Sequence, residues 1–498
     1  MRVDMVSKFL GFLTIVICAC MLCPFAYAFA IGGEDVIPFA KALVAGISAA
    51  AGLLVFGHKA ALSKMGTREA LAMVTLSWIA ASAVSGLPYW FHGAAPTYTD
   101  AFFESMSGFT TTGATILTDI DDVPRGLILW RGITHWLGGM GIIVLTLAVM
   151  PLTGIGGFQL FQAEVPGMTA ERITPRIRQT AVILWLTYVV LTLAQALLLV
   201  VGGMGFYEAL TYSIGTVSTG GFSPNSASIQ HFDSSYVDWI VTLFMFASGV
   251  NFALYFRAIK GRLLRTFFRD PEFRFYLGVA LTLSVLVSLG LYFKTSLTFA
   301  NSLRFGFFQV ISFTTTTGFV SMDYDTWPFF CKSILFLCLF LGACAGSTSG
   351  GIKQIRLLVL VRHANRQITR ILSPRAIIPL RVGDKSVDAG VVSSCLAFLG
   401  LYAMVYAAGV FLITLYEPDL FTAIAGVATT LGNVGPGFGS LGATGTFATQ
   451  ATGAKWIYAF LMLCGRLELY SVLVLFTRAY WSGDAASYRR ATGGTSSG

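Results

Sequence analysis

The sequence predicts an all-α polytopic membrane protein in which four similar units surround one central pore, preceded by two extra N-terminal transmembrane helices. Each unit is expected to contain a helix, a re-entrant pore helix and a second helix. The first observation is composition: 55% of the 498 residues are hydrophobic and 11% are charged, with a mean hydropathy of +0.73, whereas soluble domains carry about a quarter charged residues. The second is a series of bilayer-length apolar segments, and the third is a short glycine-containing stretch that recurs four times.

Ten apolar segments are long enough to cross a bilayer, which takes about 20 residues. They cover residues 8–31, 36–57, 69–92, 126–150, 176–201, 236–257, 273–294, 327–372 with an interruption, 388–416 and 454–481. The first segment also fits a secretory signal, because Lys8 precedes it and Ala28-Phe29-Ala30 fits a cleavage site. Its length favours a retained span over a cleaved leader.

Four shorter stretches lie between successive apolar segments and end in small and hydroxyl residues. They align without a gap as DAFFESMSGFTTTGAT (100–115), YEALTYSIGTVSTGGF (207–222), FGFFQVISFTTTTGFV (305–320) and TAIAGVATTLGNVGPG (422–437). This alignment places Gly113, Gly220, Gly318 and Gly435 in one column, with a period of about a hundred residues, longer than solenoid repeats. Stretches of this length suit a re-entrant helix followed by a loop.

The repeats divide the chain into a two-helix domain and four pore repeats. The expected bounds are 1–66 for the two-helix domain, then 67–157, 158–262, 263–373 with a broken final helix, and 374–498 with the C-terminal tail. Arginine and lysine concentrate in the connections between units, so the positive-inside rule places these connections and both termini in the cytoplasm. All repeats then share one orientation, which disfavours an inverted-repeat transporter and favours a pore.

The hydroxyl residues around each glycine are candidate ligands of a monovalent cation. Four non-helical loops facing one axis can turn their carbonyl oxygens inward and replace the hydration shell of an ion, and glycine permits the positive φ that this requires. The hydroxyl groups either add oxygens or brace the loop from behind. Close helix packing explains one such run but not four in one column. The predicted filter residues are Thr111, Thr112, Gly113, Ser218, Thr219, Gly220, Thr316, Thr317, Gly318, Asn433, Val434 and Gly435.

A second candidate site is the segment GACAGSTSGG (342–351), which interrupts the last span of the third unit with small residues. The helix should break there and face a water-filled cavity, although small residues also allow close helix packing. Arg466 lies in an apolar span, where an arginine costs at least ~2.5 kcal/mol and requires acceptors. We expect these to be the carbonyls of 343–350, and Glu468 to pair with another helix. The candidate gate residues are Gly346, Ser347, Thr348, Ser349, Gly350, Gly351, Lys353 and Arg466.

Other classes of site are disfavoured. The cysteines lie in apolar or small-residue stretches without a histidine at metal-ligand spacing, and HExxH and Walker motifs are absent from the sequence, so no catalytic site is expected. His135, beside LGGMG, suggests a metal or proton-relay residue, but a single histidine on an apolar helix is expected to be a hydrogen-bonded core residue. The net charge of +9 follows from the basic connections between units. The expected partner is therefore a lipid bilayer, and binding of nucleic acid is not expected.

Six motifs carry a family resemblance: GFTTTGAT, VSTGGFSP, FTTTTGF, GNVGPGFG, AGSTSGGIKQIR and CGRLELY. They resemble the Trk/Ktr superfamily of potassium uptake proteins, and most closely its TrkH-like membrane subunit. The resemblance implies uptake of K⁺ across the bacterial cytoplasmic (inner) membrane, no organic cofactor in this chain, a homodimer and a cytosolic nucleotide-binding regulatory subunit. It also implies that the intramembrane loop obstructs the pore until this partner moves it, and that Arg466 is an electrostatic barrier. A sodium- or proton-coupled potassium symporter of the same superfamily is the alternative.

The stretches depart from the filter of tetrameric potassium channels. Ala114, Gly221, Phe319 and Pro436 follow the aligned glycines, so no repeat continues with Tyr-Gly, and the fourth lacks the hydroxyl pair. We therefore expect potassium to be preferred over sodium less strictly than in those channels.

Overall fold

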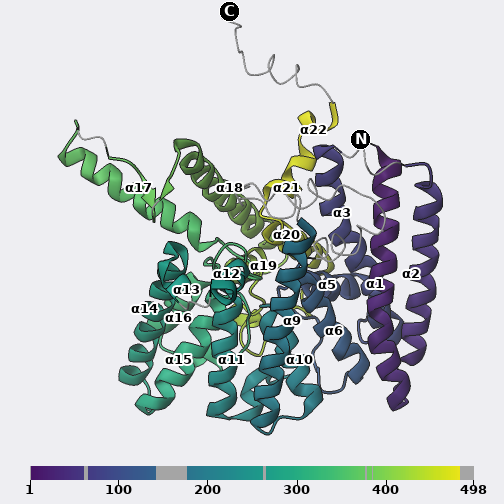
Figure 1. The fold of residues 1–498 in the computed structure, drawn as a ribbon. Helices are drawn as coiled ribbons and strands as arrows, with labels where there is room; N and C mark the ends of the chain where they lie inside the picture. Colours follow the sequence, from purple (N-terminus) through teal and green to yellow (C-terminus); the bar gives the residue numbers. More distant parts are fainter. Residues whose placement is uncertain are drawn as a thin grey trace, which may run out of the picture.

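The computed structural model describes residues 2–60, 66–141, 177–261, 265–375, 378–383 and 385–482, and most of these are helical (Figure 1). The boundaries expected at 157/158 and 262/263, and the 142–150 part of one predicted span, lie outside these residues. The N-terminal helices and the first repeat contain α1 (Val3–Ile31), α2 (Val36–Phe56), α3 (Thr67–Ser85), α4 (Leu87–His92), α5 (Tyr98–Phe109) and α6 (Arg125–Gly139). The second repeat contains α9 (Ile177–Val201), α10 (Phe206–Val217), η3 (Ser228–Phe232), α11 (Ser235–Ser248) and α12 (Phe252–Gly261).

The third and fourth repeats follow the same order of elements. The third contains α13 (Arg265–Arg269), α14 (Pro271–Lys294), α15 (Phe299–Thr314), η4 (Tyr324–Thr326), α16 (Phe329–Cys338) and α17 (Gln354–Leu372). The fourth contains β1 (Arg381–Val382), β2 (Lys385–Ser386), α18 (Ala389–Ile413), α19 (Leu420–Gly432), η5 (Gly439–Leu441), α20 (Thr452–Arg466), α21 (Tyr470–Leu473), η6 (Val474–Phe476) and α22 (Arg478–Ser482). Among the described residues, the departures from an all-α fold are the antiparallel pair β1–β2 and an isolated β-bridge between Leu341 and Ile352.

The predicted spans correspond to helices. Among the described residues, six helices are long and apolar enough to cross a membrane, or up to eight if each of two bent helix pairs counts as one span. α6 begins the predicted span 126–150, and α16 and α17 flank the interruption predicted within 327–372. α1 packs against α2, α3 and α6 with Met5, Phe9 and Leu13 buried, so it is an integral part of the fold.

Two spans that the sequence predicts as unbroken are instead sharply bent. α11 and α12 meet at 93°, and α20 meets the α21–η6 segment at 115°. At the first bend, Gly249 O accepts a hydrogen bond from Cys344 N (3.0 Å), and Phe252 N donates to Gly346 O (3.1 Å). Backbone from the third repeat thus supplies partners that a continuous helix would supply itself. At the second bend, Glu468 and Leu469 both have positive φ, 53° and 64°, which ends the helix.

The four short helices α5, α10, α15 and α19 lie where the sequence predicts re-entrant helices. Three of them begin with a side-chain cap. Thr97 forms a capping box with Asp100 on α5, Thr298 accepts from Asn301 N on α15, and Asp419 accepts from the first turn of α19. Each such cap stabilises a helix by about 0.5–2 kcal/mol. The caps fix where these three short helices start.

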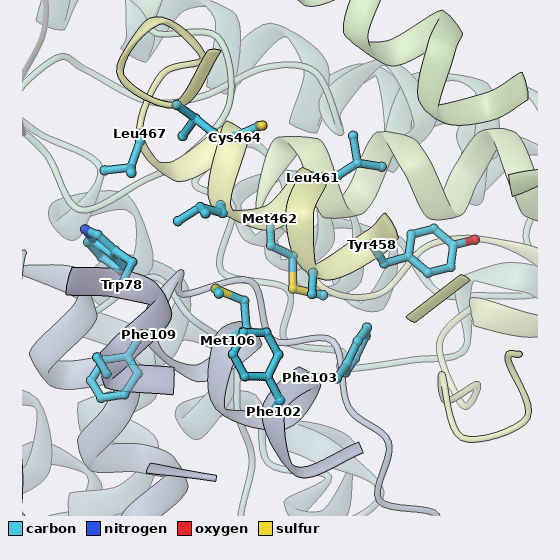
Figure 2. Packing of buried hydrophobic residues seen from close by; sticks show 14 of the residues in the cluster. Trp78, Phe102, Phe103, Met106, Phe109, Tyr458, Leu461, Met462, Cys464 and Leu467 are labelled. Atoms are coloured by element: carbon cyan, nitrogen blue, oxygen red, sulfur yellow. The ribbon is translucent and has the colours of Figure 1, made fainter. Parts of the chain in front are cut away.

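The first and last repeats pack together, which closes the arrangement of repeats. Figure 2 shows the side chains that α5, α20 and α3 bring into one buried cluster. They include Phe102, Phe103, Met106 and Phe109 of α5, Tyr458, Leu461, Met462 and Cys464 of α20, Leu467, and Trp78 of α3. The rings of Phe103 and Phe447 are 5.3 Å apart. In a bilayer this dense van der Waals packing is what holds helices together.

Candidate functional site

Each re-entrant helix ends in a turn with the same backbone geometry, which we call a glycine turn (residues 111–113, 219–221, 316–318 and 433–435). The first residue of each turn has positive φ although it is not glycine: Thr111 (52°), Thr219 (53°), Thr316 (59°) and Asn433 (55°). The third residue also has positive φ: Gly113 (83°), Gly221 (79°), Gly318 (81°) and Gly435 (100°). The middle residue donates its N–H back to the helix in every repeat, over 2.8–3.0 Å. The four turns are therefore structural equivalents.

The register in the second repeat differs from the sequence alignment by one residue. The alignment pairs Gly220 with Gly113, whereas the backbone pairs Gly221 with Gly113. Ser218, predicted as a filter residue, therefore precedes the turn, and its hydroxyl donates to Ile214 O at 2.7 Å. A gapless comparison does not show which glycine of a Gly-Gly pair adopts positive φ. The residue after the second turn is accordingly Phe222 rather than Gly221.

The four glycine turns form a closed ring. A Cβ atom built on the final glycine of any turn would overlap the carbonyl oxygen of the middle residue in the next repeat, and the fourth turn meets the first. These Cβ–oxygen distances are 2.3 Å for Gly113 to Gly220, 1.9 Å for Gly221 to Thr317, 2.0 Å for Gly318 to Val434 and 2.4 Å for Gly435 to Thr112. Glycine is therefore required both by conformation and by space. The structure brings all four predicted glycine stretches to one place.

The side chains of the turns are bonded to protein, while their central carbonyls are not. Thr112 Oγ1 pairs with Thr110 Oγ1, and Thr317 Oγ1 with Thr315 Oγ1, both at 2.8 Å. These hydroxyls therefore brace the turns, one of the two roles expected from the sequence. Within the described part of the chain, no hydrogen bond reaches the carbonyl oxygens of the four middle residues, which are Thr112, Gly220, Thr317 and Val434.

A cavity lies beside the ring, on the side of the loops that follow the turns. Its volume is about 350 Å³, and its lining includes Gly113, Gly221, Gly318 and Gly435 together with loop residues of several repeats. Hydrogen bonds between repeats surround it: Phe447 N donates to Thr115 O (2.8 Å), and Gln230 N donates to Val320 O (3.2 Å). The ring thus borders a hollow formed by loops of several repeats.

The opposite side of the ring is covered by the interruption of the third repeat, which we call the intramembrane segment (residues 342–353). The helix breaks where the sequence predicts, between α16 and α17. Gly350 N donates to Thr316 Oγ1 (2.7 Å), and Thr348 Oγ1 donates to Val217 O (3.1 Å), the last carbonyl of α10. A Cβ on Gly350 would lie 2.6 Å from Gly432 O, the last carbonyl of α19. The segment is therefore in direct contact with the turns and with two re-entrant helix ends.

Arg466 connects the intramembrane segment to the first repeat. Its guanidinium donates to Thr348 O (2.7 Å), Thr111 Oγ1 (3.2 Å), Gly138 O (2.6 Å) and Gly139 O (2.9 Å). The expected acceptor in 343–350 is thus present. Glu468 instead forms an ion pair with Arg356 of α17, as expected of a partner on another helix.

The remaining predicted gate residues hold the segment together internally. Lys353 Nζ donates to Ser349, and Ser347 Oγ and Ser349 Oγ are 3.0 Å apart. Gly346 and Gly351 adopt positive φ, 75° and 63°. Glu272 of α14, which the sequence did not single out, accepts from Ala345 N (2.6 Å) and Ile355 N (3.2 Å) and so joins both ends of the segment.

Sequence reasoning also missed three buried ion pairs that link the helices around the ring. They are Arg131–Glu104 (2.7 Å), Arg304–Asp238 (2.6 Å) and Lys455–Asp100 (2.6 Å). The signal for them is a charged residue within an otherwise apolar helix, because such residues need partners inside the protein. Lys455–Asp100 joins the fourth repeat to the first, and Arg304–Asp238 joins the third to the second. These two pairs fix the repeats relative to one another, whereas Arg131–Glu104 joins α6 to α5 within the first repeat.

Four equivalent re-entrant helices that deliver a ring of glycine turns within one chain define a pore-forming membrane transport protein. The chain belongs to the TrkH family, since the family model described as "Cation transport protein" matches residues 36–487. It is accordingly a transport protein and not an enzyme.

Proteins similar to this chain include several Trk system potassium uptake proteins. The TrkH protein of Salmonella typhimurium is 42% identical over 418 residues, covering 83% of this chain and 86% of the relative. The TrkH protein of Halomonas elongata is 36% identical over 484 residues, covering 97% of this chain and all of the relative. The crystal structure of the potassium transporter TrkH from Vibrio parahaemolyticus matches with a TM-score of 0.86 and 32% identity, over 97% of this chain and all of that one.

Proposed function

We propose that this protein takes up potassium ions through the ring of four glycine turns. The observation that carries the proposal is the closed ring itself, in which each turn contacts the next and the central carbonyl oxygens have no hydrogen bond within the described residues. Carbonyl oxygens around a narrow passage replace the hydration shell of an alkali cation. The re-entrant helices also direct their C-terminal ends, with partial negative charge, towards the ring. The potassium uptake named for the relatives supports K⁺ as the transported ion.

Selectivity for potassium over sodium is proposed to be less strict than in tetrameric potassium channels. Only the middle carbonyl of each turn meets the glycine of the neighbouring repeat, so the constrained part is short. The fourth turn also carries Val434 in place of the braced threonine found at Thr112 and Thr317.

The intramembrane segment and Arg466 are proposed to form the gate. Together they cover one side of the ring and place a positive charge beside Thr111, which opposes the approach of a cation. The segment leads directly into α17, which extends away from the rest of the molecule in Figure 1. A partner that displaces α17 would therefore also pull on the intramembrane segment, because the two are consecutive in the chain.

The assembly is proposed to be a homodimer with a cytosolic nucleotide-binding regulatory subunit, in the bacterial inner membrane with both termini in the cytoplasm. The exposed surface of α17 suits such contacts, because it combines Arg362 and Arg370 with the exposed apolar side chains of Ile368, Ile371 and Leu372. The basic connections between repeats suit anionic lipid headgroups.

Rubidium uptake by liposomes containing the purified protein tests the proposed function. We expect a potassium-loaded liposome to accumulate external ⁸⁶Rb⁺, and added K⁺ to compete more strongly than added Na⁺, because both large cations fit the same carbonyl ring. Liposomes prepared without protein give the background. Uptake no greater than this background, measured for the protein alone and again with the intramembrane segment deleted, would contradict the proposal.

A further inference from the structure

The middle position of the glycine turns differs between repeats in a way that the sequence alignment concealed. With the corrected register, this position holds Thr112, Gly220, Thr317 and Val434. Three repeats therefore place a side chain behind the ring, and in the first and third its hydroxyl pairs with the threonine two residues earlier. In the second repeat Ser218 occupies that earlier position, but Gly220 offers it no partner.

The backbone does not require glycine at position 220. Thr219 and Gly221 on either side have positive φ, whereas Gly220 is not in that region, so an L-amino acid fits the conformation. What excludes a side chain is His135 of α6. A Cβ on Gly220 would lie 2.1 Å from His135 Nδ1 and 2.6 Å from its Cγ. The imidazole ring occupies the space where a side chain of residue 220 would begin.

His135 is held there without hydrogen bonds, contrary to the expectation of a hydrogen-bonded core residue. The side chain is 0% exposed, and its ring contacts Phe222 edge-on, with centroids 4.0 Å apart. Neither ring nitrogen has a hydrogen-bond partner among the residues that the structure describes. Burying an imidazole whose nitrogens have no hydrogen-bond partner costs free energy. The contact with Gly220 offers a functional reason for a histidine at this position.

We propose that His135 is a positioning residue for the second glycine turn and thereby a determinant of ion selectivity. Its imidazole fills from α6 the space that a side chain of the turn fills in the other repeats. It thereby holds the carbonyl of Gly220 in close contact with Gly113 of the first repeat. The inference rests on the proposed function, because it assigns a part of the same ring. It follows that a side chain at position 220 should be able to replace the volume lost when His135 is shortened.

Three variants reconstituted at equal amounts test this proposal through the ratio of Rb⁺ to Na⁺ permeability. His135→Ala leaves a space behind the turn, and we expect the ratio to fall about tenfold, equal to about 1.4 kcal/mol of discrimination. Gly220→Thr alone overlaps the imidazole, and we expect it to lose selective flux as well. The double variant His135→Ala/Gly220→Thr restores a side chain with a hydroxyl near Ser218, and we expect it to recover most of the wild-type ratio.

The control is Trp136→Phe, on the next residue of α6. Trp136 bonds to Thr192 (3.2 Å) and stacks on Tyr188, and phenylalanine keeps the stacking ring, so this substitution should leave the permeability ratio unchanged. An unchanged ratio in His135→Ala, or a double variant no more selective than His135→Ala, would overturn the inference. Both results presuppose a selective wild type, so a wild type without Rb⁺ uptake would contradict the proposed function instead. Thermal unfolding midpoints of the variants are measured alongside. A permeability ratio that changes without a matching change in the midpoint reflects the ring rather than the stability of the whole protein.

Discussion

Replacing Gly318 with serine is expected to abolish most of the discrimination between potassium and sodium. At φ 81° a side chain is strained, which costs about 1–3 kcal/mol. A Cβ there would also lie 2.0 Å from Val434 O and 2.7 Å from Pro436 Cδ, so the third and fourth turns must move apart. Because each tenfold change in relative affinity corresponds to about 1.4 kcal/mol, we expect the Rb⁺-to-Na⁺ flux ratio in liposomes to fall at least about tenfold.

The matched control for this variant is Gly278→Ser in α14. A Cβ on Gly278 meets nothing within 4 Å, and its φ is not positive, so the flux ratio should equal that of the wild type. Equal ratios for Gly318→Ser and Gly278→Ser, at equal reconstitution, would show that Gly318 does not shape a selective passage.

Removing the charge of Arg466 is expected to raise cation flux in the absence of any partner protein. A unit charge several ångströms from a cation contributes about 2–4 kcal/mol at an effective dielectric constant near 20, so Arg466→Ala should increase basal ⁸⁶Rb⁺ flux by about tenfold or more. The same substitution removes the bond to Thr348 O and so loosens the intramembrane segment. Deletion of residues 346–350 should raise basal flux as well, since it removes the contact between Gly350 N and Thr316 Oγ1.

Two further variants separate charge from structure. Arg466→Lys keeps the positive charge but not the fork of donors, so we expect flux between those of the wild type and Arg466→Ala. Arg478→Ala, which removes an exposed arginine of α22, should leave flux unchanged. If flux stays at the wild-type level in both Arg466→Ala and the deletion, neither feature obstructs the pore.

The sequence predicts the fold class because its signals are local. Apolar length identifies the spans, and the recurrence of hydroxyl-glycine stretches identifies four repeats and, apart from the register of the second repeat, the residues that meet in the ring. The break between α16 and α17 is predictable from local sequence as well, since residues 342–351 are rich in glycine, a poor helix former. Arg466 finds an acceptor in the expected segment because a guanidinium in an apolar span has few alternatives.

The features that the sequence does not predict depend on tertiary contacts between helices and loops. The bend between α11 and α12 arises where Cys344 and Gly346 supply backbone partners, and Gly249 and Asn251 alone do not establish a bend there. Which residue of the Gly220-Gly221 pair adopts positive φ cannot be read from two adjacent glycines, and the structure assigns it to Gly221. The partners in Arg131–Glu104 and Arg304–Asp238 are likewise set by helix packing rather than by spacing.

The most direct test of the central claim is to locate bound ions in the protein. Crystals grown with rubidium or thallium, examined by anomalous scattering, should show a peak on the axis of the ring, among the carbonyl oxygens of Thr112, Gly220, Thr317 and Val434. The peak should weaken when Na⁺ replaces the heavier ion and should be lost in Gly318→Ser. Ion peaks elsewhere in the molecule, with none at the ring of a protein that transports rubidium, would contradict the account.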